Sequence, residues 1–193
     1  MNTKNFLIAF LVLVNPISLA QHNEVHNHNP IENTSLGNIF EEIKIDFELS
    51  DHNGNKISVR DFFGQFIFIG FGFTNCPNVC PMMAFNIGNT INSLEIDATG
   101  IFISVDSERD TPQITHKYAS NFGENMIGLS GSFEEINKVA NNFNISYAIT
   151  KTQNNYTVQH TSNIYIITPS GELLDIVPFN TSSSELIDRI NKL

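Results

Sequence analysis

The sequence predicts an α/β domain in which a central mixed sheet carries helices on both faces. Two continuous apolar runs of strand length, 66–73 and 101–105, are typical of strands that are covered on both sides. Helix-start signals follow both runs, and Pro169-Ser-Gly171 predicts a tight turn between two later strands. The length of 193 residues suits one such domain with its own core.

The first half of the domain opens with a pair of short strands. Residues 43–49 alternate apolar and polar side chains, as a half-buried strand does, and Asp51-His-Asn-Gly54 predicts a turn into a return strand at 56–59. The first apolar run is the expected central strand. Residues 74–80 form the expected loop after it, and Pro81 is suited to the first turn of the next helix.

The second half continues with helices and strands in alternation. Thr111 followed by Pro112 predicts a helix that ends before Gly123, because Thr is a favoured cap and Pro a favoured first helical residue. Ser132 with Glu135 is a capping-box pattern that opens another helix. The remaining expected elements are a hairpin of 145–149 and 156–158, strands at 164–167 and 173–177, and a terminal helix opened by Ser182–Ser184.

Residues 1–20 have the pattern of a secretory signal peptide. Lys4 precedes an apolar run at 6–14, and Ser18-Leu-Ala20 offers small side chains for cleavage. The alternative is a membrane anchor retained through residues 6–20, although the run is shorter than the roughly 20 residues that a membrane span needs. The sequence therefore predicts an exported protein with no stable membrane span once the signal is cleaved.

Residues 21–40 are polar, and we interpret them as a tether before the domain at 41–193. The tether contains His22, His26 and His28, which either bind copper, nickel or zinc weakly or simply belong to an Asn-rich tail. Without the signal, the chain would carry a net charge of about −11. This charge disfavours nucleic acid and anionic lipid as partners.

The only two cysteines are Cys76 and Cys80, between a predicted central strand and a predicted helix. At a helix N-terminus the free N–H groups and the helix dipole favour thiolate, the form that attacks disulfides and binds soft metals. A purely structural disulfide is disfavoured, because closing so short a loop would remove only about 2 kcal/mol of chain entropy. Two thiolates at this spacing suit Cu(I) better than a hard cation.

A third ligand would have to come from elsewhere in the fold. Outside the tether the candidates are His52 in a turn, His116 in a polar helix, and His160 between the predicted hairpin and the strand at 164–167. An isolated histidine is more often structural, so the pattern alone leaves this choice open. Met82 and Met83 lie near the cysteines, but we expect both to pack in the core.

Three segments together resemble the SCO/SenC family. F-G-F-T-N-C-P-N-V-C-P at 71–81 is similar to the family's CxxxCP signature, and S-V-D-S-E-R-D-T-P at 104–112 is similar to its second motif. V-Q-H-T-S-N-I-Y-I-I-T-P-S-G at 158–171 is similar to the third motif, which contains a metal-binding histidine. The order and spacing of the three agree with the family across nearly all of residues 41–193.

The resemblance implies a thioredoxin-like fold with an inserted β-hairpin and binding of both Cu(I) and Cu(II). It assigns Cys76, Cys80 and His160 as the metal ligands, and it implies assembly of the binuclear copper centre of cytochrome c oxidase. Asp106 and Arg109 match motif positions for which we expect structural or partner-docking roles. The acidic residues that the family often has between the cysteines and before the histidine are replaced here by Asn78 and Gln159. We expect these replacements to affect the tuning of the site or partner recognition.

The sequence thus predicts a copper metallochaperone that passes copper to a thiolate-rich acceptor, a cytochrome c oxidase subunit. The main alternative is a thiol–disulfide oxidoreductase in which Cys76 and Cys80 form a redox-active pair. A peroxidase-like thiol enzyme is disfavoured by the His-containing third motif, and a pure interaction module would leave the cysteines without a purpose. In an oxidising compartment, for which we expect the bacterial periplasm, a thiol reductant protein would be a further partner.

Overall fold

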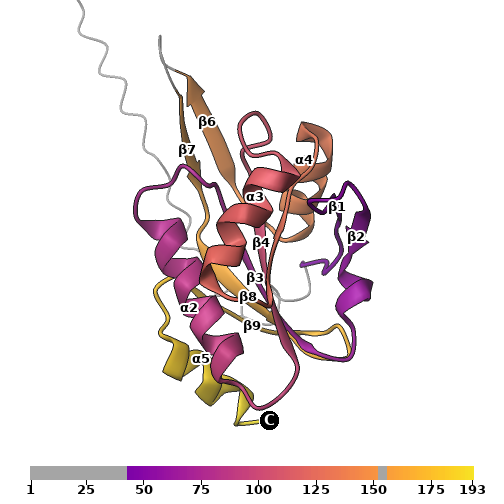
Figure 1. Cartoon of the computed structure of the whole chain (residues 1–193), viewed down its shortest axis with the longest axis vertical. Coiled ribbons are helices and arrows are strands. Elements are labelled where there is room, and N and C mark those ends of the chain that lie inside the picture. Colours follow the sequence, from indigo (N-terminus) through magenta and orange to yellow (C-terminus); the bar gives the residue numbers. More distant parts are fainter. Residues whose placement is uncertain (1–42, 152–155) are drawn as a thin grey trace, which may run out of the picture. The chain divides into compact units, whose positions relative to one another are not determined.

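A five-stranded mixed sheet forms the centre of the computed structural model, which describes residues 43–151 and 156–193 (Figure 1). The strand order is β5-β4-β3-β8-β9. Three neighbouring strands are parallel, namely β3 (Phe66–Gly72), β4 (Ala98–Ser104) and β5 (Met126–Leu129). The other two, β8 (Asn163–Ile167) and β9 (Leu173–Pro178), continue the sheet in antiparallel fashion from β3. The predicted mixed sheet is therefore confirmed.

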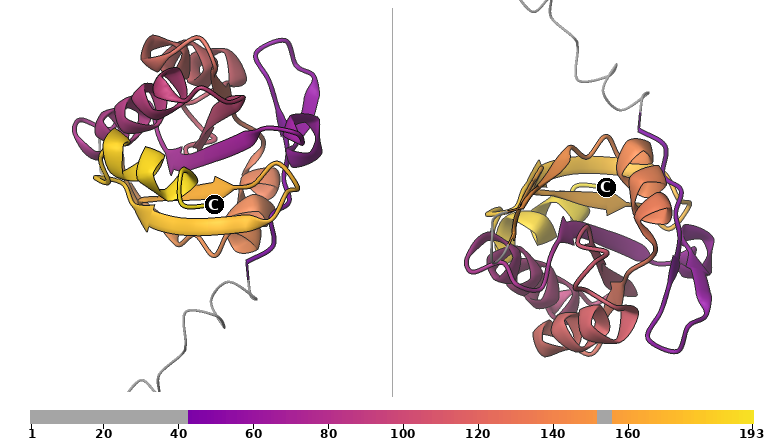
Figure 2. Two further views of the ribbon diagram at one scale, coloured as in Figure 1. Left: turned by 90° about the horizontal axis from the view of Figure 1, so that it is seen from below. Right: turned by 90° about the horizontal axis from the view of Figure 1, so that it is seen from above.

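Helices cover both faces of this sheet, as predicted. One face carries α2 (Val79–Ser93), α3 (Pro112–Ala119) and α5 (Ser183–Ile190), whereas α4 (Phe133–Asn142) lies on the other (Figure 2). The three later helices begin where the sequence indicates. The side chains of Thr111, Ser132 and Ser182 each accept a hydrogen bond from a backbone N–H in the first turn that follows.

Close packing of α2 and α3 on the sheet depends on glycines that face these helices. A Cβ atom on Gly70 would lie 2.8 Å from Cε of Met83, and one on Gly128 would lie 2.3 Å from the Thr115 carbonyl oxygen. Large side chains alternate with these glycines across the sheet, since Phe102 pairs with Gly70 on one side and with Gly128 on the other. The Phe102 side chain fills the space between the helices and this face of the sheet, while the glycines let α2 approach β3 closely. The start of α2 therefore lies directly on the sheet.

Two hairpins lie outside the central sheet. One consists of β1 (Glu48–Ser50) and β2 (Lys56–Ser58), and the other of β6 (Tyr147–Lys151) and β7 (Tyr156–His160). The second is the predicted inserted hairpin. Its final residue is His160, so the histidine lies within a strand and not in the connection that the sequence indicated.

Several predicted boundaries were wrong. The strand expected from residue 43 begins only at Glu48, because the backbone before it bonds the end of α4: the Lys44 N–H donates to the Asn142 carbonyl oxygen. The 3₁₀ helix Val59–Phe62 replaces the end of the return strand, and β5 was not predicted. Helix α2 begins at Val79, which places Cys80 inside its first turn and not in the loop.

The predicted signal peptide at 1–20 and the tether at 21–40, with His22, His26 and His28, lie outside the described residues. Among the helices that the structure describes, none is both long and apolar enough to cross a membrane.

Candidate metal and dithiol site

The two cysteines lie where β3 passes into α2. Both are free thiols; Cys80 is completely buried and Cys76 is partly exposed. The Cys80 backbone N–H donates a hydrogen bond to Cys76 Sγ over 3.4 Å. Gly72 makes room for the inner thiol, because a Cβ atom at that position would lie 2.9 Å from Cys80 Sγ. The fold therefore holds one sulfur against the sheet and the other at the surface.

The two thiols differ in acidity because their surroundings differ. Burial by itself would raise the pKa of Cys76, but the Cys80 thiol and the backbone N–H groups of Cys80, Asn78 and Val79 more than offset this effect, and the net pKa is lowered. Burial, followed by the hydrogen bond to Cys76, strongly raises the pKa of Cys80. Cys76 is thus the thiol that ionises first.

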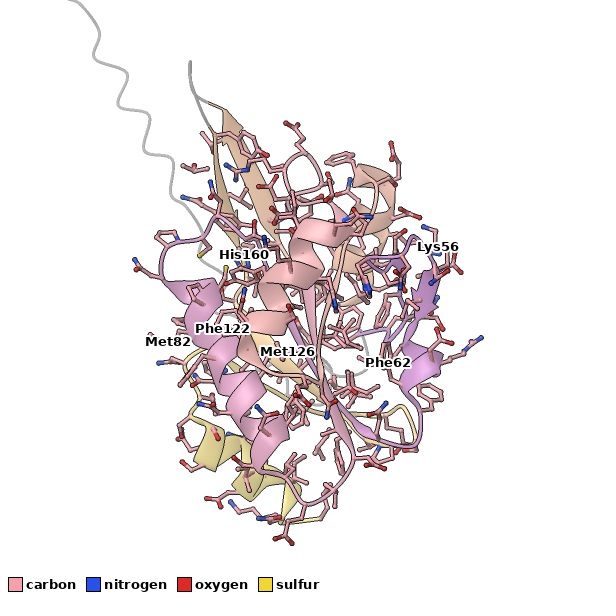
Figure 3. The ribbon with its side chains drawn as sticks, in the orientation of Figure 1. Lys56, Phe62, Met82, Phe122, Met126 and His160 are labelled. Atoms are coloured by element: carbon pink, nitrogen blue, oxygen red, sulfur yellow. The ribbon has the colours of Figure 1, made fainter. Side chains whose placement is uncertain are left out.

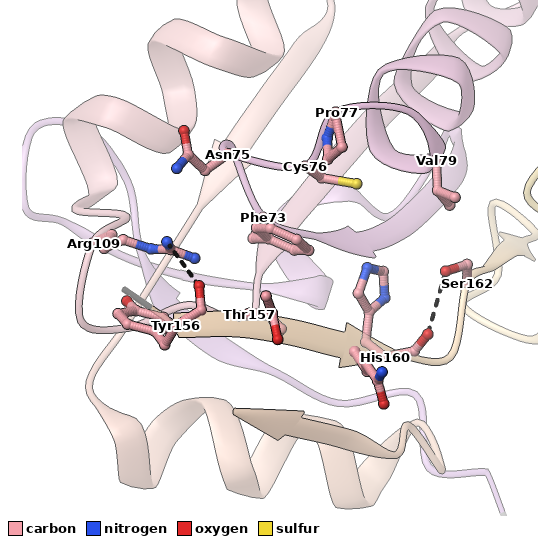
Figure 4. Close-up of a pocket in the computed structure, with 12 residues that line it drawn as sticks. Phe73, Asn75, Cys76, Pro77, Val79, Arg109, Tyr156, Thr157, His160 and Ser162 are labelled. Carbon is pink, nitrogen blue, oxygen red and sulfur yellow. Dashed lines mark hydrogen bonds between the residues drawn. The ribbon is translucent and has the colours of Figure 1, made fainter. Parts of the chain in front are cut away.

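The His160 side chain projects from the end of β7 toward the loop that carries Cys76 (Figure 4). Its Nε2 lies 3.6 Å from Cys80 Sγ, and its Nδ1 lies 2.9 Å from the Thr161 carbonyl oxygen. A carbonyl oxygen can only accept, so Nδ1 must carry the proton and Nε2 keeps its lone pair toward the sulfur. Burial lowers the pKa of the ring, partly offset by the Thr161 carbonyl, and this also favours the neutral form.

The separation of 3.6 Å between sulfur and nitrogen is the one expected of two ligands that share an ion. With metal bonds of about 2.3 Å to thiolate and about 2.0 Å to imidazole, as for zinc, an angle of about 110–120° at the metal separates the donors by about 3.6 Å. In the described part of the chain, however, no three His, Cys, Asp or Glu side chains are already gathered as a metal site. The structure brings Cys80 and His160 together. Cys76 lies beside them at the surface, where its sulfur accepts a hydrogen bond from the Cys80 backbone N–H.

A pocket opens in front of these residues (Figure 4). Cys76 and His160 line it from opposite sides, and the Phe73 ring packs edge-on against the imidazole with centroids 5.9 Å apart. Gln159, one of the replacements noted in the third motif, also lines the pocket, whereas Asn78 is exposed at the N-cap of α2 without a capping hydrogen bond from its side chain. A ligand or partner can therefore approach Cys76 from solvent.

Asp110 fixes the loop that carries Cys76, a role that the sequence analysis missed. Its carboxylate is buried and accepts hydrogen bonds from the Thr74 N–H (2.7 Å), the Thr74 hydroxyl (2.6 Å) and the Ser104 hydroxyl (2.6 Å). Thr74 is two residues before Cys76. Asp110 belongs to the second of the three motifs, but no spacing rule indicates that this motif reaches the cysteine loop.

Asp106 and Arg109 join the second motif to the hairpin that carries His160. The Asp106 carboxylate is fully buried, forms an ion pair with Arg109 at 2.5 Å and accepts a hydrogen bond from the Tyr156 hydroxyl. The Arg109 guanidinium also stacks over the Tyr156 ring, 3.8 Å from its centroid. Tyr156 begins β7 and His160 ends it, so these contacts support the structural role expected for Asp106 and Arg109.

The two other histidine candidates that the structure describes contact each other. The rings of His52 and His116 stack on each other with centroids 4.0 Å apart. Met83 is buried in the core as expected, but the prediction for Met82 was wrong, because its position on the outer side of α2 leaves it 49% exposed.

These features define a class of protein, a thioredoxin-like domain with a dithiol at the start of a helix and a histidine supplied by an inserted hairpin. The family profile SCO1/SenC matches residues 38–193, and the chain belongs to that family.

Known relatives agree with this assignment. The chain is 34% identical over 147 residues to the human protein "SCO1 homolog, mitochondrial"; the match covers 72% of this chain and 49% of the relative, so the chain spans about half that relative's length. The crystal structure of Arabidopsis thaliana ScoI with copper bound is similar with a TM-score of 0.70 and 31% identity, covering 78% of this chain and 99% of that one.

A further solved structure concerns BsSco, described as a member of the Sco family of cytochrome c oxidase assembly proteins with a disulfide switch. It matches with a TM-score of 0.60 and 27% identity, covering 78% of this chain and 93% of that one.

Proposed function

We propose that this protein is a copper metallochaperone that binds Cu(I) and Cu(II) through Cys76, Cys80 and His160. The observation that carries the proposal is the approach of His160 Nε2 to Cys80 Sγ at 3.6 Å, with the lone pair of that nitrogen facing the sulfur. The copper-bound Arabidopsis structure supports copper as the metal. Two thiolates and one imidazole form a donor set that copper favours in both oxidation states.

Copper would be the cargo of this site. On binding, the two thiols lose their protons to solvent, and the imidazole coordinates through Nε2 while Nδ1 stays bonded to Thr161. Release would begin on the exposed side. An incoming thiolate of the acceptor would bond the copper beside Cys76, and Cys80, which is buried, would leave last. No electron is transferred in this exchange.

We propose a cytochrome c oxidase subunit as the acceptor, at its binuclear copper centre. The description of BsSco as an oxidase assembly protein supports this choice. We further propose that residues 1–20 direct export, with the bacterial periplasm as the compartment, or anchor the chain in a membrane through residues 6–20 if they are retained. Cys76 is partly exposed and its pKa is lowered, so it would be open to oxidation in that compartment. A thiol reductant protein would then be required as a second partner.

The test is the copper stoichiometry and affinity of the reduced protein, with His160→Ala compared with wild type. His52→Ala is the matched control, because that histidine contacts His116 and not the cysteines. We expect one copper ion per wild-type chain, a loss of at least tenfold in Cu(II) affinity in His160→Ala, and no change in the control. Unchanged Cu(II) affinity in His160→Ala would remove the histidine from the site.

The second candidate is a thiol–disulfide oxidoreductase. It is favoured by the pairing of a partly exposed thiol of lowered pKa with a buried one, and by the disulfide switch described for BsSco. An insulin-reduction assay distinguishes the two functions. Rapid turnover that is unaffected by His160→Ala, combined with weak copper binding, would favour the enzyme.

A further inference from the structure

Helix α2, which begins at the copper site, has no charged residue in its 15 residues. The whole chain carries 30 charged side chains among 193 residues, so a helix of this length without a single charge is unusual for this protein. Its outer side instead presents Met82, 49% exposed, and Phe85, 56% exposed. Figure 3 shows Met82 on the side of α2 that faces away from the sheet.

This outer side is continuous with the pocket of the copper site. Val79 lines that pocket together with Cys76 and Pro77. Met82 is one helical turn beyond Val79 and Phe85 is one turn further, so the two exposed side chains follow within about 9 Å along the helix axis. We call Pro77, Val79, Met82 and Phe85 the α2 rim.

A protein that reaches Cys76 has to cover this rim. A specific interface occupies about 800 Å² on each partner, which corresponds to a disc of about 16 Å radius. A disc of that size centred on Cys76 includes the first turns of α2. The exposed apolar side chains would then lie inside the contact area, where Met and aromatic side chains are enriched and charged residues are depleted.

We propose that the α2 rim is the docking surface for the copper acceptor, and that the acceptor presents an uncharged, apolar surface on the side of its thiolates that faces this rim. This inference rests on the proposed function and specifies its partner. Met82 and Phe85 do not line the pocket themselves, but they follow Val79, which does, on the same helix. Ile114 on α3 and Phe133 on α4 are also strongly exposed, but no residue of those two helices lines the pocket. The rim is therefore distinguished by its place beside Cys76 and by its lack of charge.

The test is copper transfer from the loaded protein to a purified, copper-free domain of cytochrome c oxidase that carries the binuclear site. Phe85→Asp and Phe85→Ser are compared with wild type, and Phe133→Asp is the matched control because Phe133 is 54% exposed on α4. Bicinchoninate, a small Cu(I) chelator, serves as an acceptor that needs no docking surface.

We expect Phe85→Asp to slow transfer to the oxidase domain at least tenfold and Phe85→Ser to slow it severalfold. Copper stoichiometry, extraction by bicinchoninate and all rates of Phe133→Asp should equal those of wild type.

Each failure has a distinct meaning. If wild type transfers copper to the domain and Phe85→Asp does so at the same rate, the docking surface is refuted and the chaperone function stands. If wild type gives copper to bicinchoninate but none to the domain, the proposed function fails and the docking surface fails with it. If wild type is a dimer in sedimentation and Phe85→Asp is a monomer, the rim binds a second copy of this chain, which also refutes the proposal.

Discussion

Replacement of Asp110 should release the loop that holds Cys76. Its buried carboxylate accepts three hydrogen bonds, two from Thr74 and one from Ser104. A hydrogen bond to a charged group contributes about 1.5–3 kcal/mol, and each buried donor left without an acceptor costs about 1–3 kcal/mol. Part of that sum is offset because a charge no longer has to be buried. For Asp110→Ala we therefore expect a loss of about 3–5 kcal/mol in the free energy of unfolding.

Weaker substitutions should give a graded series. Asp110→Asn keeps one acceptor oxygen and should cost about 1–2 kcal/mol, and Thr74→Val removes one hydroxyl donor and should cost about 1 kcal/mol. The control is Asp175→Ala, which breaks a partly exposed ion pair with Arg189 and should change stability by about 0.5 kcal/mol. Since whole domains have only about 5–15 kcal/mol of stability, the Asn variant remains measurable even if the Ala variant unfolds.

The assay is urea denaturation of the reduced protein, followed by circular dichroism, together with iodoacetamide labelling of Cys80 in the native state. Labelling should accelerate in the same order as stability falls, because the loop that Asp110 holds leads directly into the first turn of α2, which carries this buried sulfur. If Asp110→Asn and Asp175→Ala were equally stable and Cys80 were equally protected in both, the tethering role of Asp110 would be wrong.

Three further results are expected. Iodoacetamide should label Cys76 before Cys80. Because the pKa of Cys76 is lowered, its labelling rate should reach half its maximum at a pH below the pKa of an ordinary thiol. Equal rates at both sulfurs would contradict this. Gly72→Ala would place a Cβ atom 2.9 Å from Cys80 Sγ, so we expect the free energy of unfolding, measured by urea denaturation, to fall by about 1–3 kcal/mol and copper to bind more weakly. Wild-type stability and copper binding in this variant would mean that the sulfur moves freely. The metal-free protein should lose stability as the pH falls below the ordinary histidine value of about 6.5, because burial lowers the pKa of folded His160 and the unfolded chain takes up the proton first. The dependence of stability on pH should be weaker in His160→Gln. If it is the same as in wild type, this histidine is not the cause.

The parts of the fold that could be predicted are those with local physical causes. The apolar run that became β3 and the caps at Thr111, Ser132 and Ser182 depend on neighbouring residues only. The segment at 43–47, where the described structure begins, could not be predicted in the same way. Residues 43–47 have the alternation of a strand, but the Lys44 N–H finds its acceptor at the end of α4, which is far away in sequence.

The residues of the candidate site also differ in whether the local sequence predicts their role. Cys76 and Cys80 could be recognised from their spacing and from their place before a helix. His160 required a resemblance to known proteins, because the register of β6 with β7, which pairs Tyr147 with His160, determines where the imidazole lies. Asp110 escaped notice since its role depends on the side-by-side arrangement of β3 and β4, which places Ser104 opposite Gly72.

The unequal exposure of the two sulfurs also has a consequence for any bond between them. A bulky reducing thiol could attack only the outer sulfur, Cys76, so that Cys80 would have to depart as the leaving group. Burial makes that sulfur a strong base, and strongly basic thiolates leave slowly. Once oxidised, the disulfide would be reduced slowly by general thiol reductants. Its reduction would be faster with a dedicated protein that stabilises the Cys80 thiolate as it leaves.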